Sequence, residues 1–474
     1  FWHVMVHRRG LVLCLALASG LQATRPAGPR GARPPSSLRS GEAYLECDGA
    51  ADDVAEWFAR ARRENKALLA RRAVPRHHFE GGVDAAAVLA LSRTAVRSRV
   101  VVGDGKKLVK SPFAATLLDA PVGWTLLVND AELHLPAVAR LRDAVSETVL
   151  GEKTSRWRRD DVMVSVASDG GGVGPHVDTS EVVLLQAAGT RRWAIETAPV
   201  SRDDAEARLD PTKGTRCLVD FKPDASWVLE PGDFIYIPAR VPHDGVAIFD
   251  SSVEGDAAQL CVTVSLGFRE YSANDLAARW ADDAALDDDF GTAGMKLVDL
   301  GGVGDDSPAE ISRETREAAK AAIRASLEAR LSDDVVLAKL LGEVVTEPRD
   351  ASALEDLLES LDDASVVDEP RRALKLVFSG KATLHHAVGA RFAHALARSH
   401  DGDEVVVLCA NGSCHEAAPR LQGLARLVST SSDIGDIVER SGVAPDDEEA
   451  RDLIRSLLET SALVARRCTA AEDR

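Results

Sequence analysis

One group of residues in this sequence has the types and spacing of a metal site. His176 and Asp178 stand two residues apart in DGGGVGPHVD, and His243 follows in PGDFIYIPARVPHDG. Residues two apart in an extended segment point to the same side, so His176 and Asp178 can reach one ion. Two imidazoles and one carboxylate form the facial triad that binds Fe(II) and leaves coordination positions open. These three residues are therefore the predicted metal ligands and catalytic residues.

The histidine-x-aspartate pair has little weight by itself, because 12 histidines in an aspartate-rich chain produce about one such pair by chance. Its weight comes from its place between two strand-like runs and from the EPGD and PARVP turns that precede His243. On ligand type alone zinc is an alternative, since His and carboxylate also serve catalytic zinc. The strand context and a nearby arginine favour iron.

That arginine belongs to a basic pair, Arg191 and Arg192, on the next predicted strand. A chelated 2-oxoglutarate keeps its far carboxylate inside the barrel, and burying that charge requires a cation, preferably a guanidinium. Side-chain alternation lets only one of the two arginines face inward. The alternative is that both are exposed surface charges.

The elements around these residues indicate a β-rich core. Short runs rich in Val and Ile follow one another between residues 161 and 269: VMVSVA, EVVLLQ, RRWAIE, WVLEPGDFIYIP, GVAIF and LCVTVSLGF. Such a series without long helices between its members favours a barrel or sandwich. Before it, helices are predicted over 54–72 and 131–149. In the second of these helices one face would carry Val138, Leu141, Val145 and Val149.

The chain after residue 269 has a helical pattern. Further helices are expected over 335–345 and 354–361, and apolar residues recur at helical spacing at Ile311, Ala319, Ile323, Leu327 and Leu331. Nearer the end, EVVVLCANGSCHEA places the turn 411–412, Asn-Gly, between two extended arms, which predicts a hairpin with a type I′ turn. A hairpin among helices is typical of a winged-helix module.

Composition limits the choice of partner and compartment. A formal net charge of -18 argues against a nucleic-acid-binding surface and suits a basic protein partner. Seven cysteines without a CxxC pair indicate neither a disulfide framework nor a structural zinc site, so a reducing compartment is expected. No stretch is long and apolar enough to predict a membrane span.

The first forty residues resemble a signal or organelle-targeting segment. The chain begins at Phe1, and Met5 is a candidate start followed by basic residues, an apolar run over 11–21 and an acid-free Arg/Pro-rich stretch over 24–39. We expect a plastid or mitochondrial location, with a cytoplasmic location as the alternative. A disordered N-terminal tail is the alternative to a targeting segment.

Several longer motifs are similar to those of the JmjC-type ribosomal oxygenases, closest to the bacterial ribosomal-protein arginine hydroxylases. They are GGGVGPHVD, GTRRW, LEPGDFIYIP with PH a few residues later, and VSLGFR, and the similarity extends to VNDAELHLPAVARLR and the ANG hairpin. The resemblance implies an α+β fold whose double-stranded β-helix, a JmjC or cupin barrel, is followed by a helical dimerisation region and a winged-helix-like domain. The corresponding boundaries are 1–40 for targeting, 41–270 for the JmjC domain, 271–365 for dimerisation and 366–474 for the winged helix.

The resemblance also assigns roles to residues. It implies iron on the triad, 2-oxoglutarate on Arg191, and Ser265 of VSLGFR in the same pocket. Asp169 is a candidate for holding a substrate guanidinium, and a turn-capping role is its alternative. Thr190 stands where the family usually has arginine, and the stretch between His243 and VSLGFR is longer than in the bacterial pattern.

The expected activity is hydroxylation of an arginine in a large-subunit ribosomal protein by a homodimer that uses Fe(II) and 2-oxoglutarate and contacts neither nucleic acid nor membrane. Alternatives are hydroxylation of a histidine or of another protein, a zinc or manganese cupin enzyme, and a cupin that binds without turnover.

Overall fold

The computed structural model describes residues 43–468, with gaps at 112–122, 152–158, 250–259, 287–315, 348–364 and 431–436 and further gaps of one to three residues. The predicted targeting segment, the predicted helix 354–361, and Ile311, Ala319, Ile323 and Leu327 lie outside the described residues. Among the described helices, none combines the length and the apolar character that crossing a membrane requires.

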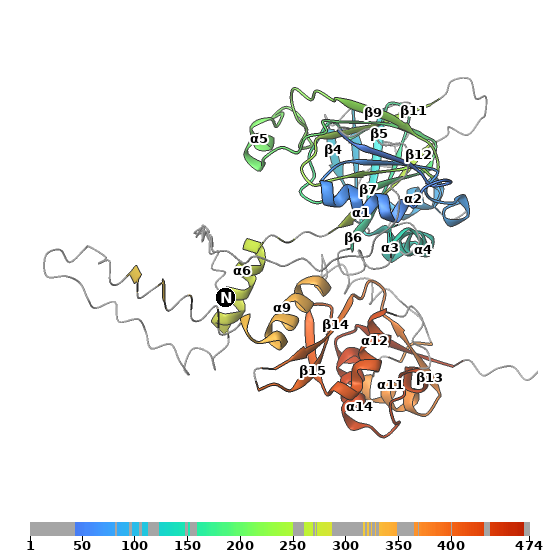
Figure 1. The fold of residues 1–474 in the computed structure, drawn as a ribbon. Helices are drawn as coiled ribbons and strands as arrows, with labels where there is room; N and C mark the ends of the chain where they lie inside the picture. Colours follow the sequence, from blue (N-terminus) through green and yellow to red (C-terminus); the bar gives the residue numbers. More distant parts are fainter. Residues whose placement is uncertain are drawn as a thin grey trace, which may run out of the picture. The chain divides into compact units, whose positions relative to one another are not determined.

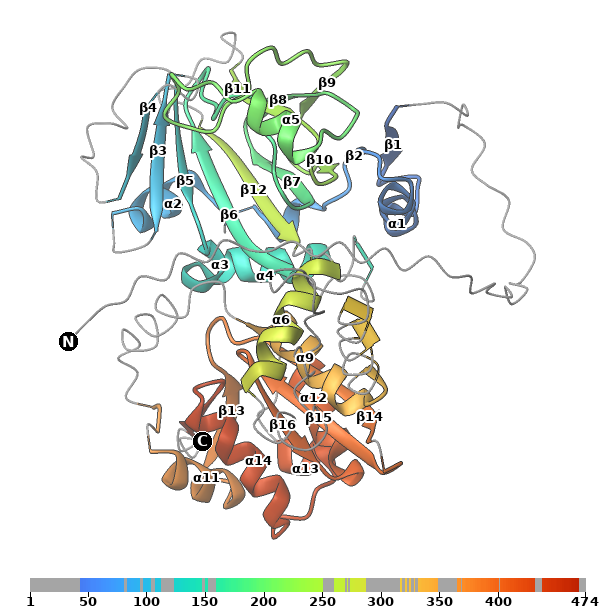
Figure 2. The ribbon, with the colours of Figure 1, turned by 90° about the vertical axis from the view of Figure 1, so that its left-hand side faces the viewer.

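The first part of the chain forms two β-sheets. The large sheet has the strand order β1-β2-β10-β7-β12-β6-β5-β3-β4, and the small sheet has the order β11-β8-β9. All neighbouring strands are antiparallel except β1 and β2, which are parallel. Strands β9 and β11 of the small sheet lie at the top of both views (Figures 1 and 2). The strands are β1 (Leu45–Asp48), β2 (Leu68–Arg71), β3 (Ser98–Val102), β4 (Lys107–Lys110), β5 (Trp124–Val128), β6 (Arg159–Ala167), β7 (Val182–Ala188), β8 (Thr190–Ile195), β9 (Ala225–Leu229), β10 (Phe234–Ile237), β11 (His243–Ile248) and β12 (Cys261–Phe268). Every strand-like run predicted between residues 161 and 269 is confirmed.

A hydrophobic core joins the two sheets. It packs Leu184 of β7 and Ile235 of β10 against Trp193 and Ile195 of β8. Successive side chains of a strand point to opposite faces, so one face of each strand points into the space between the sheets. The interior of the barrel is therefore defined by the residues that share a face with this core.

Helix α1 (Val54–Glu64) packs on the face of the large sheet that points away from this core. On α1, Phe58 is 1% exposed, and its ring centroid lies 5.1 Å from that of Tyr236 on β10. The other helical elements of this part are η1 (Arg76–His78), α2 (Ala85–Leu91), α3 (Ala131–His134), α4 (Pro136–Ala144) and α5 (Arg202–Ala207).

Two helix predictions were wrong in extent. The helix predicted over 54–72 ends at Glu64, because Asn65 adopts a left-handed conformation and the following residues form β2 between β1 and β10. Backbone pairing on both sides outweighs the helical pattern there. The helix predicted over 131–149 is divided at Leu135, since Pro136 has no N–H to donate and starts a new helix. Its predicted apolar face is confirmed as buried at Val138, Leu141 and Val145, and Val149 lies outside the described residues.

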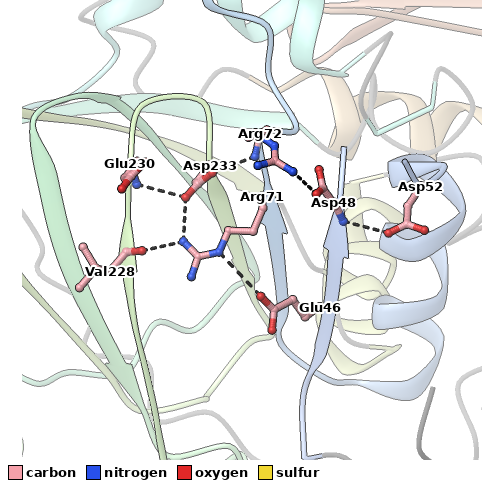
Figure 3. Close-up of polar contacts among 8 residues, drawn as sticks. All are labelled: Glu46, Asp48, Asp52, Arg71, Arg72, Val228, Glu230 and Asp233. Carbon is pink, nitrogen blue, oxygen red and sulfur yellow. Dashed lines mark hydrogen bonds and ion pairs between the residues drawn. The ribbon is translucent and has the colours of Figure 1, made fainter. Parts of the chain in front are cut away.

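A buried carboxylate ties β2 to the turn before β10. Asp233 of the EPGD turn is 4% exposed and accepts hydrogen bonds from Arg71 Nη1 at 2.8 Å, Arg72 N at 2.8 Å and Glu230 N at 3.1 Å. Figure 3 shows the carboxylate of Asp233 between these donors, with Glu46 on the far side of Arg71. The Asp of EPGDFIYIP therefore connects the N-terminal strands to the barrel.

The C-terminal part of the chain combines helices with two small sheets, β13-β17 and β14-β15-β16. One buried cluster joins both sheets to the helices, with Leu384, Leu408, Leu424 and Leu457 among its members. The elements after β12 are α6 (Ala273–Leu286), α9 (Asp334–Thr346), α11 (Pro370–Phe378), β13 (Ala382–His386), β14 (Phe392–Arg398), β15 (Glu404–Ala410), β16 (Ser413–Ala417), η5 (Pro419–Leu421), α12 (Gln422–Thr430), α13 (Ile437–Ser441), α14 (Glu448–Glu459) and β17 (Leu463–Arg467).

The predicted helix 335–345 and the predicted hairpin are both confirmed. β15 and β16 pair around Asn411 and Gly412, whose φ values of 49° and 83° are the positive values that a type I′ turn requires. On α9, Val335 packs with Val407 and Cys409 of β15. The predicted domain boundary between residues 365 and 366 falls between α9 and β15, which pack together. This boundary stays a prediction.

The hairpin contains a disulfide, although the sequence indicated no disulfide framework. Cys409 and Cys414 are directly opposite on β15 and β16, and a disulfide joins them. The signal was present in the sequence, because the predicted two-residue turn at 411–412 places Cys409 opposite Cys414. Cys47, Cys217, Cys261 and Cys468 are not part of a disulfide.

Candidate metal centre

Two segments place the triad histidines directly opposite each other. His176 lies in the loop after β6 and His243 is the first residue of β11, and the N–H of each donates to the carbonyl oxygen of the other at 2.9 Å. Two residues that exchange both backbone hydrogen bonds project their side chains to the same side. Asp178 follows two residues after His176, and its carbonyl oxygen accepts from Arg240 N at 2.9 Å. The two segments thus carry all three predicted ligands to one place.

The three side chains converge on a common point. Candidate ligand atoms of His176, Asp178 and His243 all lie within 4.8 Å of one another. Asp178 Oδ2 is 3.6 Å from His243 Nε2, and Asp178 Oδ1 is 4.0 Å from His176 Nε2. Two nitrogens and one oxygen around one point form a facial set that fits a divalent transition metal.

The backbone prepares both imidazoles for metal binding. Nδ1 of His176 is 2.8 Å from the carbonyl oxygen of Gly174, and Nδ1 of His243 is 2.9 Å from that of Val241. A carbonyl only accepts, so each Nδ1 carries the proton and each Nε2 keeps its lone pair for a metal. Burial, reinforced by the neighbouring His176, lowers the pKa of His243 to about 4. His243 is therefore neutral near pH 7, as a metal ligand must be.

The glycines of DGGGVGPHVD allow the loop to lie close against the barrel. A Cβ on Gly171 would overlap the carbonyl oxygen of Trp124, and one on Gly172 would be 2.9 Å from the carbonyl oxygen of Gly245. Ala247 N donates to Gly171 O at 2.9 Å, so the loop follows β11 up to the triad. The run of glycines is explained by this close approach.

Arg191 faces the interior of the barrel and Arg192 faces outward. Along β8, Arg191 is 4% exposed and Arg192 is exposed, which is the alternation of a strand with one buried face. Nε and Nη2 of Arg191 are buried without a hydrogen-bond partner among the described residues. A buried guanidinium with unpaired N–H groups is suited to an anionic ligand.

Arg191 and the triad line the same interior face. Along β11, His243 is opposite Ile195, Gly245 is opposite Trp193, and Ala247 is opposite Arg191. Residues on β8 two apart share a face, so Trp193 lies between the triad and Arg191. A ligand that contacts both the metal and Arg191 would pass along Trp193.

The other two predicted site residues have different surroundings. Ser265 on β12 is opposite Leu184, a member of the barrel core, so it faces the interior. Asp169 is exposed, and its Oδ1 accepts from the N–H of Phe249, just beyond the end of β11, at 3.1 Å. This contact connects Asp169 to the chain after β11, and its role toward a substrate guanidinium stays a prediction.

Sequence reasoning overlooked Trp193 and Gly245. A Cβ on Gly245 would be 2.6 Å from ring atoms of Trp193, so glycine is required for the indole to lie over β11. The signal was available for Trp193, which stands two residues after Arg191 in GTRRW and therefore on the same face. For Gly245 it was absent, since strand pairing is not visible in the sequence.

Comparison with known proteins agrees with this geometry. Residues 149–276 match the family model for the JmjC domain. This segment is therefore similar to a JmjC domain. It is similar to the probable ribosomal oxygenase of Haemophilus influenzae, with 30% identity over 220 residues that make up 45% of this chain and 49% of that protein. It is also similar to the ribosomal protein uL16 3-hydroxylase of Escherichia coli, with 32% identity over 182 residues, 38% of this chain and 43% of that protein.

These sequence matches span about half or less of the curated relatives' length. The fold is shared over a greater length. The X-ray structure of E. coli YcfD covers 84% of this chain and 95% of that chain, with a TM-score of 0.62 and 21% identity. A structure of YcfD, a ribosomal oxygenase from E. coli, in complex with cobalt and 2-oxoglutarate matches with a TM-score of 0.60 and 20% identity.

Proposed function

We propose that this chain is an Fe(II)- and 2-oxoglutarate-dependent hydroxylase that acts on an arginine of a large-subunit ribosomal protein. The observation that carries the proposal is the combination of the triad with the buried, unpaired guanidinium of Arg191 inside one barrel. A cupin that only bound a metal would not need a cation there. A small dicarboxylate that chelates the metal at one end explains both features.

The residues present fit these groups. Nε2 of His176, Nε2 of His243 and the Asp178 carboxylate would hold the iron on one side and leave the opposite positions open. His243 has a side-chain exposure of 2%, whereas Asp178 has 47%, so the site opens on the Asp178 side. A protein substrate would approach from that side.

When bound, iron and 2-oxoglutarate supply the activation of O2 that hydroxylates a C–H bond and releases succinate and CO2. Arg191 binds the far carboxylate of 2-oxoglutarate, and Ser265 offers a hydroxyl in the same pocket. The indole of Trp193 excludes water between the two ends of the cosubstrate. Gly174 and Val241 keep the protons of the two imidazoles on Nδ1, so that Nε2 of each histidine stays unprotonated and free to bind the metal.

The relatives support the choice of substrate class. The E. coli relative is a hydroxylase of the ribosomal protein uL16, so uL16 is the first substrate to test. Asp169 is proposed to pair with the substrate guanidinium, for which a carboxylate is the matching partner. The net charge of -18 suits a basic ribosomal protein and disfavours direct nucleic-acid binding.

Assembly and location are part of the same proposal. We infer a homodimer formed through the region 271–365, a winged-helix-like C-terminal domain, and a plastid or mitochondrial location, where ribosomes of bacterial type occur. Microscopy of the tagged protein tests the location. A signal confined to the secretory pathway would contradict it.

Turnover of 2-oxoglutarate to succinate by purified residues 41–474 with Fe(II) tests the activity. We expect turnover that rises with one uL16 peptide, is lost in His176→Ala, and is kept in the control His77→Ala, whose exposed imidazole lies on η1. Mass spectrometry should show one added oxygen atom on an arginine of that peptide. An oxygen on histidine would change the target residue, and iron binding without turnover on any ribosomal peptide would favour a binding module.

A further inference from the structure

Two cysteines face each other across the hairpin of the C-terminal part. The turn 411–412 is closed by the pair Ala410 and Ser413, and the next pair is Cys409 and Cys414. The second pair from a two-residue turn is a non-hydrogen-bonded pair, whose side chains approach most closely. The Cα atoms of Cys409 and Cys414 are 4.0 Å apart and their sulfurs are bonded. The bond therefore forms without a change in strand register.

Helix α9 lies directly on this sulfur pair. A Cβ on Gly342 would overlap Cys409 Sγ and would be 3.1 Å from Cys414 Sγ, so only glycine fits there. Cys414 Sγ is 3.3 Å from the carbonyl oxygen of Lys339, to which a thiol can donate and a disulfide cannot. The redox state of the pair therefore changes a contact of α9.

Polar contacts connect the same helix to both ends of the hairpin. Thr346 is fully buried, and its Oγ1 donates to Gly342 O at 2.8 Å and accepts from the turn residue Gly412 N at 2.9 Å. Lys339 Nζ is 3.1 Å from Glu416 Oε1 on β16. The hairpin and α9 thus form one packed unit, so a change at the sulfurs can alter the packing of the helix.

The two sulfurs differ in access. Cys409 is 1% exposed, whereas Cys414 is half-buried. Cys409 also lines an apolar groove of about 600 Å³ that includes Leu341 of α9 and Leu396 of β14. A soluble thiol or disulfide would reach Cys414 first, and Cys409 would complete the exchange from inside.

We propose that Cys409 and Cys414 are a reversible redox site, and that oxidation removes the hydrogen bond from the Cys414 thiol to Lys339 O of α9. In oxidation by glutathione disulfide, the Cys414 thiolate attacks one glutathione sulfur and releases the first glutathione as its thiolate. The Cys409 thiolate then attacks Cys414 Sγ, forms the protein disulfide and releases the second glutathione. Two electrons pass to glutathione disulfide, and the two cysteine protons end on the two glutathiones. The exchange involves neither the metal triad nor Arg191.

Equilibration of the full chain with mixtures of reduced and oxidised glutathione tests the proposal. After acid quenching and alkylation, peptide mass spectrometry reports the state of each cysteine. We expect Cys409 and Cys414 to change together in one two-electron transition, with both alkylated in the reduced state and neither in the oxidised state. Separate modification of the two cysteines, or no disulfide in excess oxidised glutathione, would overturn the proposal.

Hydrogen exchange of the wild-type chain tests the effect on α9. Amides of residues 334–346 should exchange faster in the oxidised form, by roughly an order of magnitude, because the thiol hydrogen bond to Lys339 O is lost, while β13 is unchanged. Equal exchange of α9 in the two forms would refute the coupling. The variant Cys409→Ser should accumulate glutathione on Cys414, because the attacking thiol is missing, and the control Cys468→Ser should behave like the wild type.

Discussion

At the scale of single residues, the triad histidines are set up by the chain itself. Each imidazole is oriented by the carbonyl oxygen two residues before it, Gly174 for His176 and Val241 for His243. The same local device occurs in two segments distant in sequence. Arg191 shows the opposite arrangement, since its buried nitrogens have no partner among the described residues. The protein itself provides hydrogen-bond partners for the two histidines, whereas the buried nitrogens of Arg191 are left for the proposed cosubstrate.

The substitution Arg191→Met should weaken 2-oxoglutarate binding without destabilising the ligand-free protein. Removing the buried cation should weaken 2-oxoglutarate binding by about 100-fold or more, because a charge-assisted pair in a buried site is lost. It should also raise the melting temperature of the ligand-free protein, since an unpaired buried charge is replaced by a hydrophobic side chain of similar length. Titration of 2-oxoglutarate and a thermal melt measure the two effects.

Arg192→Met is the matched control, because Arg192 is the exposed neighbour on the same strand. It should leave both the affinity and the melting temperature near those of the wild type. If the two variants weakened 2-oxoglutarate binding equally, Arg191 would not be the anchor.

At the scale of elements, α3 carries a buried acid whose ionisation depends on folding. Burial raises the pKa of Glu132 to about 7, although Arg142 and the backbone N–H of Val162 oppose the shift. Glu132 Oε2 accepts from Val162 N at 3.0 Å, which connects α3 to β6. The folded chain therefore binds a proton here over a pH range in which the unfolded chain has lost it.

Glu132 should make the protein less stable as the pH rises from about 4.5 to about 7. In this window Glu132 is ionised in the unfolded state and protonated in the folded state. The contribution of Glu132 to stability is therefore complete below pH 4.5 and is lost as the pH rises through the folded pKa. The shift corresponds to a loss of about 3 kcal/mol in the free energy of unfolding. Urea unfolding at several pH values should show this loss in the wild type and not in Glu132→Gln. The exposed control Glu56→Gln should retain the wild-type pH dependence.

The tether between β2 and β10 depends on one carboxylate. Asp233→Ala should lower the free energy of unfolding by about 3 kcal/mol, because three donors, one of them the charged Arg71, lose a buried acceptor. Glu46→Ala is the control, since Glu46 pairs with the same arginine at 3.7 Å from a half-exposed position (Figure 3). Its effect should stay within about 0.5 kcal/mol. Equal losses in urea unfolding would contradict a special role for Asp233.

At the scale of the whole molecule, the proposed dimer can be tested through exposed leucines. Leu331 is 55% exposed and lies in the region 271–365, whereas Leu396 is 42% exposed on β14 outside it. Burying an exposed leucine at an interface is favourable, and a charge there opposes association. Leu331→Asp should give a monomer of 50.5 kDa in light scattering, and the wild type and Leu396→Asp should give twice that mass. A monomeric wild type would exclude the proposed dimer.

Local sequence patterns were sufficient for the features whose cause is local. The Val- and Ile-rich runs became strands, Asn411-Gly412 became the hairpin turn, and the spacing of His176 and Asp178 brought both side chains to one side. The helix predicted beyond Glu64 failed because its last residues pair with β10, more than 160 residues away in the sequence. A pattern read along the chain contains no information about such a partner.

By itself the sequence determined the ligand types of the candidate centre, the succession of strands along the chain that holds them, and the hairpin near the C-terminus. Tertiary structure alone decided that Arg191 faces inward, that Trp193 lies over Gly245, and that α9 packs on the Cys409–Cys414 pair. The reason is physical: residue spacing sets which side chains share a face of one segment, whereas strand pairing and helix packing set which face is buried and what it meets.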